Sequence, residues 1–82
     1  MQRADIEKEL TIVFRDIFQD NTIVLMPSMT AKDIDGWDSL NHINLVLAVE
    51  KRFKVRLTVK EISRLPNVGA FTDIIDQRFN LT

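Results

Sequence analysis

Apolar residues near the start of the chain recur at the spacing of an α-helix. Between positions 6 and 18 they follow one another at steps of four, three, one, three and one, which gathers them on one side of a helix. These residues are Ile6, Leu10, Val13, Phe14, Ile17 and Phe18. Charged residues fill most positions between them, as on a face in contact with solvent. The pattern predicts an amphipathic helix of about three to four turns.

A polar stretch follows from Gln19 to Trp37 and lacks helical periodicity. It contains Pro27 and Gly36, which are common in turns, so we predict a loop. A loop this long in a compact domain is usually functional or is held in place by its own side chains. We expect its apolar side chains to fold back over the helices, with a short helical turn near Thr30 to Ile34. The residues expected to close this end of the core are Ile23, Leu25, Met26, Met29 and Ile34.

A second helix is predicted from about Ser39 to Phe53, because apolar residues again recur at spacings that a helix gathers onto one side. The residues that carry this pattern are Leu40, Ile43, Val46, Leu47 and Phe53. Ile43 and Leu47 could either pack in the core or line a cleft. The periodicity favours the core.

Two shorter signals complete the fold prediction. The segment from Thr58 to Glu61 matches the capping box, in which threonine and glutamate side chains satisfy opposite backbone donors, so a short third helix starts there. It is expected to end at Leu65 and Pro66, after which Asn67 can cap a last helix. The inward residues expected on that helix are Val68, Phe71, Ile74, Ile75 and Phe79. We therefore predict an all-α, small four-helix bundle that forms a single domain over residues 1–82.

Composition narrows the classes of function. A chain of 82 residues can build one core but not a core and a deep enclosed active site, so we do not expect a self-sufficient enzyme. The absence of cysteine removes disulfides, thiolate zinc sites and a cysteine nucleophile, so any thiol must be imported. We find no apolar run long enough to span a bilayer and no apolar core of a secretory signal, and we therefore expect a cytoplasmic protein.

Charge is distributed unevenly along the chain, although the net charge is only −1. Residues 1–38 hold eight acidic and four basic residues, which gives −4, whereas residues 39–82 hold seven basic and four acidic residues, which gives +3. Basic residues cluster between positions 51 and 56. The two halves therefore differ in the partners that their charge would attract.

Two alternative binding functions fit the sequence poorly. The basic cluster could belong to a nucleic-acid face, but a net negative charge leaves too little positive field for that function. The segment from Asp33 to Gly36 is similar to the first part of a calcium loop. The third ligand and the glutamate of such a loop do not fall at the required spacing, so we predict no metal site.

The segment from Gly36 to Asn41 places a serine hydroxyl where the polar loop gives way to the second helix. Both Asp38 and Ser39 are residue types that cap helices, which is one interpretation of this segment. Catalysis by Ser39 would need a base, such as His42, and an acid to orient that base. No such acid is evident, so we reject a serine hydrolase and expect His42 to be exposed and to contact a partner.

The tripeptide Asp-Ser-Leu, at the start of a second helix and after a long loop and Gly-Trp, resembles the attachment motif of the acyl carrier proteins. The resemblance extends from about Ile6 to about Phe79 and includes the segment from Leu45 to Glu50, together with Phe53 and Val68. It implies a four-helix bundle that acts as a non-catalytic carrier. In that family the serine, here Ser39, bears 4′-phosphopantetheine, whose thiol holds acyl groups as thioesters.

The same resemblance implies partners and a recognition surface. A magnesium-dependent phosphopantetheinyl transferase would attach the group from coenzyme A, and acyl-loading and acyl-processing enzymes would then bind the carrier, which is expected to be a monomer. Asp38 would help the transferase to dock. The residues assigned to partner recognition are Asp38, Leu40, Asn41, His42, Asn44, Val46, Leu47 and Lys51. Lining a cleft for the acyl chain is the alternative role of Ile43 and Leu47.

This chain departs from the carriers of fatty acid synthesis in one respect. Those carriers typically have a strongly acidic second helix, whereas this one is basic from Lys51 to Lys54. We therefore predict a dedicated carrier of specialised metabolism, in fatty acid or polyketide biosynthesis, with an aminoacyl or hydroxyacyl cargo left open. A peptidyl carrier is disfavoured because the approach to Ser39 is not rich in Gly-Gly. The remaining alternative is a helical protein-interaction domain without a prosthetic group, in which Ser39 is only a cap.

Overall fold

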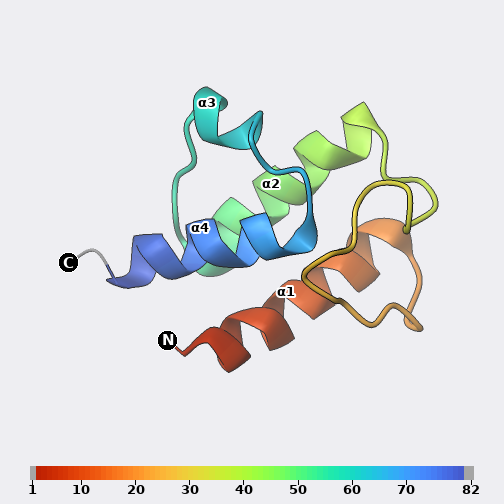
Figure 1. Cartoon of the computed structure of the whole chain (residues 1–82), viewed down its shortest axis with the longest axis horizontal. Coiled ribbons are helices and arrows are strands. Elements are labelled where there is room, and N and C mark those ends of the chain that lie inside the picture. The colour runs from red at the N-terminus through yellow and green to blue at the C-terminus, as the bar shows by residue number, and fades with distance from the viewer. Residues whose placement is uncertain (1, 81–82) are drawn as a thin grey trace.

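A computed structural model describes residues 2–80 of the chain, and all regular structure in that range is helical. The helices are α1 (Arg3–Phe18), α2 (Ser39–Phe53), α3 (Val59–Ile62) and α4 (Val68–Asn80). Figure 1 shows α1, α2 and α4 packed together, with the short α3 beside α2. The prediction of an all-α bundle with a long first loop and a short third helix is confirmed.

The buried face of α1 agrees with the periodicity of its sequence. Ile6, Leu10 and Phe14 are fully buried and Val13 is nearly so, while Ile17 and Phe18 are partly buried at the edge of the core. Phe14 is the centre of an aromatic cluster. Its ring lies 5.8 Å from that of Phe71 on α4 and 5.4 Å from that of Trp37, both edge to face. This geometry is favourable for aromatic pairs and links both helices to the end of the loop.

The loop between α1 and α2 lies against the start of α4, as Figure 1 shows at the end of the bundle. The carbonyl oxygens of Pro27 and Met29 accept hydrogen bonds, each of 2.9 Å, from the backbone N–H groups of Gly69 and Val68. These donors belong to the first turn of α4 and have no partner within their own helix. A side chain at Gly69 would place its Cβ 3.1 Å from the carbonyl oxygen of Pro27, so glycine permits this close approach.

Most of the apolar loop residues behave as expected. Ile23 and Ile34 are buried, and Leu25 and Met29 are partly buried against the core. Met26 is 59% exposed, so its assignment to the core is wrong. Residues 31–33 form a turn in which the backbone N–H of Asp33 donates a hydrogen bond of 2.9 Å to the carbonyl oxygen of Thr30, within the segment where a short turn was expected.

The bounds of α2 match the prediction, and its buried face does so in part, because Val46 and Phe53 are buried as the pattern predicted. The core receives Leu45, Val46, Val49 and Phe53. Leu40, Ile43 and Leu47 are 69%, 54% and 58% exposed, so the expectation that Ile43 and Leu47 pack in the core is wrong. Both sets of residues have helical spacing, and the set that is buried is the one that meets α1 and α4.

The helix caps at the other end of the chain are confirmed. Thr58 Oγ1 accepts a hydrogen bond of 3.1 Å from the backbone N–H of Glu61, and Glu61 Oε1 accepts one of 2.9 Å from the backbone N–H of Thr58. Asn67 Oδ1 accepts from the backbone N–H of Ala70 at 2.9 Å, which caps α4. α3 ends at Ile62, before the expected stop at Leu65.

The inward face of α4 is also largely as predicted. Val68, Phe71 and Ile75 are buried, while Ile74 and Phe79 are partly buried against the core. No helix within residues 2–80 is long and apolar enough to cross a membrane.

Candidate functional site

The start of α2 is fixed by a cap that comes from Asp38. Its Oδ1 accepts a hydrogen bond of 2.8 Å from the backbone N–H of Asn41, and its carbonyl oxygen accepts one of 2.8 Å from the N–H of His42. Ser39 is the first residue of the helix and does not cap it. The interpretation of Ser39 as a cap is therefore wrong, and the capping role belongs to Asp38 alone.

Ser39 is exposed, and its hydroxyl makes no hydrogen bond with any residue in the range 2–80. The backbone N–H groups of Ser39 and Leu40 also have no acceptor in that range, as expected for the first turn of a helix. No acidic residue lies in this turn of α2, all of which the structure describes. The site is therefore an accessible hydroxyl beside free backbone donors.

Trp37 anchors the residues before Ser39 in the core. Its side chain is only 7% exposed and contacts the rings of Phe14 and Phe71. Gly36 makes the preceding turn with φ of +88°, a conformation that glycine adopts without strain. The carbonyl oxygen of Gly36 accepts a hydrogen bond of 2.7 Å from Asn41 Nδ2. The loop is thus pinned immediately before Ser39.

His42 is half-buried and engaged at both ring nitrogens. Its Nδ1 accepts a hydrogen bond of 3.2 Å from Trp37 Nε1, and its Nε2 lies 3.2 Å from the carbonyl oxygen of Ile62. Because the indole N–H can only donate, Nδ1 carries no proton, and Nε2 donates to Ile62. The imidazole also stacks on the indole, with ring centroids 6.2 Å apart. The expectation of an exposed His42 is wrong.

This arrangement has two consequences for chemistry. His42 is committed to Trp37 and Ile62, so it is not placed to take a proton from Ser39. It instead joins the start of α2 to the end of α3. A shallow hollow lies beside Ser39 at this junction, lined also by Ala31, Trp37, Asp38, His42, Leu65 and Pro66.

The other predicted recognition residues divide into exposed and internal groups. Leu40 and Lys51 are exposed. Asn41 and Asn44 are half-buried, and Asn44 Nδ2 donates to Asn41 Oδ1 at 3.2 Å. Val46 is 2% exposed, so its assignment to a recognition surface is wrong.

The sequence analysis missed the exposure of Ile43. The steps of three and four from Leu40 through Ile43 to Leu47 gave a signal for one shared face, but this signal did not distinguish a solvent face from a core face.

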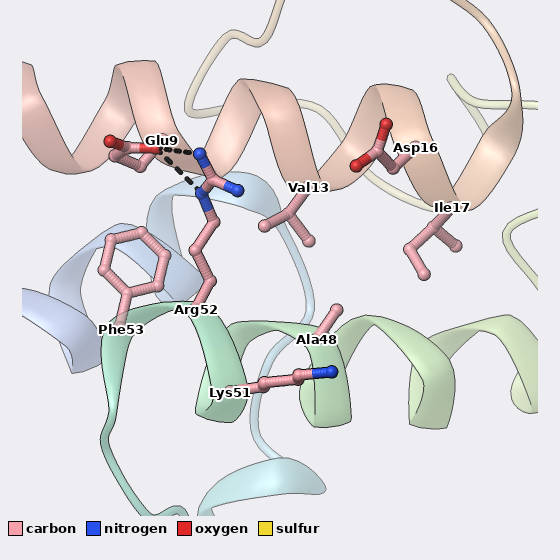
Figure 2. Close-up of a pocket in the computed structure, with 8 residues that line it drawn as sticks. All are labelled: Glu9, Val13, Asp16, Ile17, Ala48, Lys51, Arg52 and Phe53. Carbon is pink, nitrogen blue, oxygen red and sulfur yellow. Dashed lines mark hydrogen bonds and ion pairs between the residues drawn. The ribbon is translucent and has the colours of Figure 1, made fainter.

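A second hollow lies between α1 and α2, away from Ser39. Figure 2 shows Val13, Ile17 and Ala48 along it and Arg52 reaching across to Glu9. Arg52 Nη2 lies 2.5 Å from Glu9 Oε2, and Arg52 Nε donates to the same oxygen at 2.8 Å. This ion pair spans one end of the hollow and joins the two helices. Within residues 2–80, no group of three or more histidine and acidic side chains could hold a metal ion.

No protein-family model matches this chain. Among solved structures, the chain is similar to the solution NMR structure of a holo acyl carrier protein from Geobacter metallireducens. The two sequences are 40% identical, and the match covers 88% of this chain and 83% of that chain, with a TM-score of 0.82.

Proposed function

This chain belongs to the acyl carrier protein family, and we propose that Ser39 is the residue to which 4′-phosphopantetheine is attached. The observation that carries the proposal is the exposed Ser39 hydroxyl, which has no hydrogen-bond partner within residues 2–80 and stands at the first position of α2. An enzyme can therefore reach this hydroxyl without unfolding the helix.

The surroundings of Ser39 suit a phosphodiester. The backbone N–H groups of Ser39 and Leu40 are free, and the positive end of the helix dipole favours an anion at this position. Asp38 contributes the nearest negative charge in sequence, and its Oδ1 already accepts the capping hydrogen bond from Asn41. Attachment at Ser39 would leave that cap in place, so the modified and unmodified proteins should share one fold.

Ser39 acts as a substrate and needs a partner enzyme to become a nucleophile. Its Oγ would bond to the β-phosphorus of coenzyme A while the bond from that phosphorus to 3′,5′-adenosine bisphosphate breaks. The proton of Ser39 would pass to a base of the magnesium-dependent transferase, because His42 is engaged elsewhere. Once attached, 4′-phosphopantetheine supplies the thiol that holds acyl groups as thioesters, and this chain has no cysteine of its own.

Such a carrier performs no bond chemistry after loading. The chain binds each acyl-loading or acyl-processing enzyme in turn and raises the effective concentration of the cargo at that enzyme's active site. We propose a monomeric, cytoplasmic carrier dedicated to specialised metabolism, because the second helix is basic where carriers of fatty acid synthesis are acidic.

The proposal is tested by modification in vitro. The protein is incubated with coenzyme A, magnesium and a broad-specificity phosphopantetheinyl transferase, and its intact mass is measured. We expect a gain of one phosphopantetheine. Ser39→Ala should show no gain, whereas Ser28→Ala, which alters another exposed serine, should be modified like the unaltered protein.

Two results would contradict the proposal. One is the absence of a mass gain with several transferases that modify a known carrier in parallel, which would favour an interaction domain without a prosthetic group. The other is continued modification of Ser39→Ala.

A further inference from the structure

The imidazole of His42, the only histidine in the chain, lies where α2 meets three other parts of the fold. Its Nδ1 accepts a hydrogen bond of 3.2 Å from Nε1 of Trp37, at the end of the first loop. Its Nε2 donates to the carbonyl oxygen of Ile62, the last residue of α3, at 3.2 Å. Its ring also contacts that of Phe71 on α4 edge to face, with centroids 5.7 Å apart. One side chain of α2 therefore joins the first loop, α3 and α4.

The short helix α3 has a small share in the core, because it has four residues and none of them is buried. Ile62 is partly buried against the core, and Glu61 pairs with Arg78 of α4. The hydrogen bond from His42 ties the end of α3 to the first turns of α2, three positions after Ser39. The residues that follow α3 line the hollow beside Ser39, so a movement of α3 would change the shape of that hollow.

The hydrogen bond from Trp37 requires a neutral imidazole. The indole N–H can only donate, whereas the imidazolium ion carries a proton on both of its nitrogens. Protonation of His42 would therefore place two N–H donors opposite each other at the present 3.2 Å contact. Trp37 has little room to turn away, because its side chain is 7% exposed and packs against the rings of Phe14 and Phe71. The imidazole must move instead, and its Nε2 then leaves the carbonyl oxygen of Ile62.

The acidic groups near His42 have other partners. Asp38 is the one charged residue among those that the structure places around the hollow, and its Oδ1 accepts the capping hydrogen bond from Asn41. On α3, the carboxylate of Glu61 accepts from the backbone N–H of Thr58 and pairs with Arg78. On α4, Asp73 accepts a hydrogen bond of 2.6 Å from Arg3. Within residues 2–80, no carboxylate bonds to the imidazole.

The remaining charged groups near His42 do not favour a cation. The first seven residues of α2, Ser39 to Leu45, contain no acidic or basic side chain. Lys60 on α3 and Arg64 just after it are both positive. A proton on Nδ1 would therefore meet the Trp37 donor without a carboxylate to accept it.

We propose that His42 is a pH-sensitive switch, in which the neutral imidazole holds α3 against the start of α2 and protonation releases α3 from it. Histidine ordinarily changes its charge between about pH 8 and 5, so the two states interconvert near neutral pH. In the released state the hollow beside Ser39 loses the wall that Leu65 and Pro66 provide. The switch is a property of the fold and does not require that Ser39 carries a group.

The test is an NMR titration of the unmodified full chain between about pH 8 and 5. The chain has one tryptophan and one histidine, so the indole N–H and the imidazole C–H groups each give signals that need no separation from others of their kind. As the imidazole becomes protonated, we expect the indole proton to move upfield along the same curve, because it loses its acceptor. Order parameters of the α3 amides should fall from about 0.85 to below about 0.6 over the same range.

Two variants separate His42 from other titrating groups. His42→Phe keeps a flat ring beside Trp37 but binds no proton and makes neither hydrogen bond. Its indole signal should not change with pH, and its α3 amides should be mobile throughout the range. Glu61→Gln removes the other charged contact of α3 and keeps the switch, so its indole signal should still follow the imidazole.

Four results would overturn the inference. They are an imidazole that stays neutral down to about pH 5, an indole signal that stays constant while the imidazole is protonated, α3 amides that remain rigid in the protonated protein, and an unchanged pH response in His42→Phe. Failure of the proposed function looks different, because it appears as the absence of a mass gain at Ser39. Either result can occur without the other.

Discussion

The two sides of α2 are similarly apolar in sequence, but in the structure one side is buried and the other is exposed. Leu45 and Val49 are completely buried, whereas Leu40 and Leu47 are more than half exposed. On α1 the side opposite the core is charged, so the sequence distinguishes inside from outside. On α2 that distinction is absent. Apolar residues beyond those that the core can use are left on the surface, beside Ser39, where they are available for binding.

The largest expected contrast is between two leucines that are two positions apart. Leu45→Ala removes a fully buried side chain and should lower the free energy of unfolding by about 2–5 kcal/mol. Leu47→Ala removes an exposed one and should change it by less than about 0.5 kcal/mol. Urea denaturation followed by circular dichroism measures both. Similar losses for the two variants would show that Leu47 also packs in the core.

A smaller contrast concerns Asp38, which caps α2, and Ser39, which is its first residue. Asp38→Ala removes the cap and should cost about 1 kcal/mol of unfolding free energy. Ser39→Ala should cost less than about 0.5 kcal/mol, because its hydroxyl makes no hydrogen bond within residues 2–80. Thermal or urea unfolding of the unmodified proteins provides the comparison. A larger loss of unfolding free energy for Ser39→Ala than for Asp38→Ala would show that Asp38 is not the residue that caps α2.

The smallest expected effect is on stability and comes from Glu61 of α3. This short helix is joined to α2 by the contact between His42 and Ile62. The hydrogen bond from the Thr58 backbone N–H, together with the Arg78 guanidinium, lowers the pKa of Glu61 below its ordinary value. The charged form is therefore favoured by folding. Its contribution is present above the ordinary pKa and is lost as the pH falls through the lowered pKa.

Glu61→Gln tests this pH dependence. The variant should be less stable than the unaltered protein at neutral pH, and the difference should shrink as both are acidified. Unfolding midpoints measured from neutral to acidic pH provide the check, with Asp35→Asn as an exposed control. A difference that stays constant with pH would show that the charge of Glu61 does not contribute.

Helix positions could be predicted because their signals are local. The bounds of α2, the capping box at Thr58 and the cap at Asn67 each depend on residues within a few positions of one another. The hydrogen bond between His42 and Ile62 joins residues 20 positions apart, and no local pattern indicated it. The same limit explains the errors for Met26, Ile43 and Leu47, because their burial depends on where other helices pack.

The candidate site could be predicted in part. The resemblance of the Asp38 to Leu40 segment to an attachment motif selected Ser39, and the structure adds that its hydroxyl is exposed. The exposure of the residues of α2 was predicted less well. Val46 is buried and His42 is engaged with Trp37, so the exposed residues of α2 form a narrower and more apolar set than the sequence suggested.

The central claim is tested most directly by locating the attached group on a tryptic peptide. Cleavage after Lys32 and Lys51 gives a peptide of residues 33–51, in which Ser39 is the only residue with a hydroxyl side chain. After incubation with coenzyme A, magnesium and a transferase, we predict that tandem mass spectrometry finds one phosphopantetheine on this peptide, at Ser39. An unmodified peptide 33–51, in a reaction where a reference carrier is fully modified, would contradict the account.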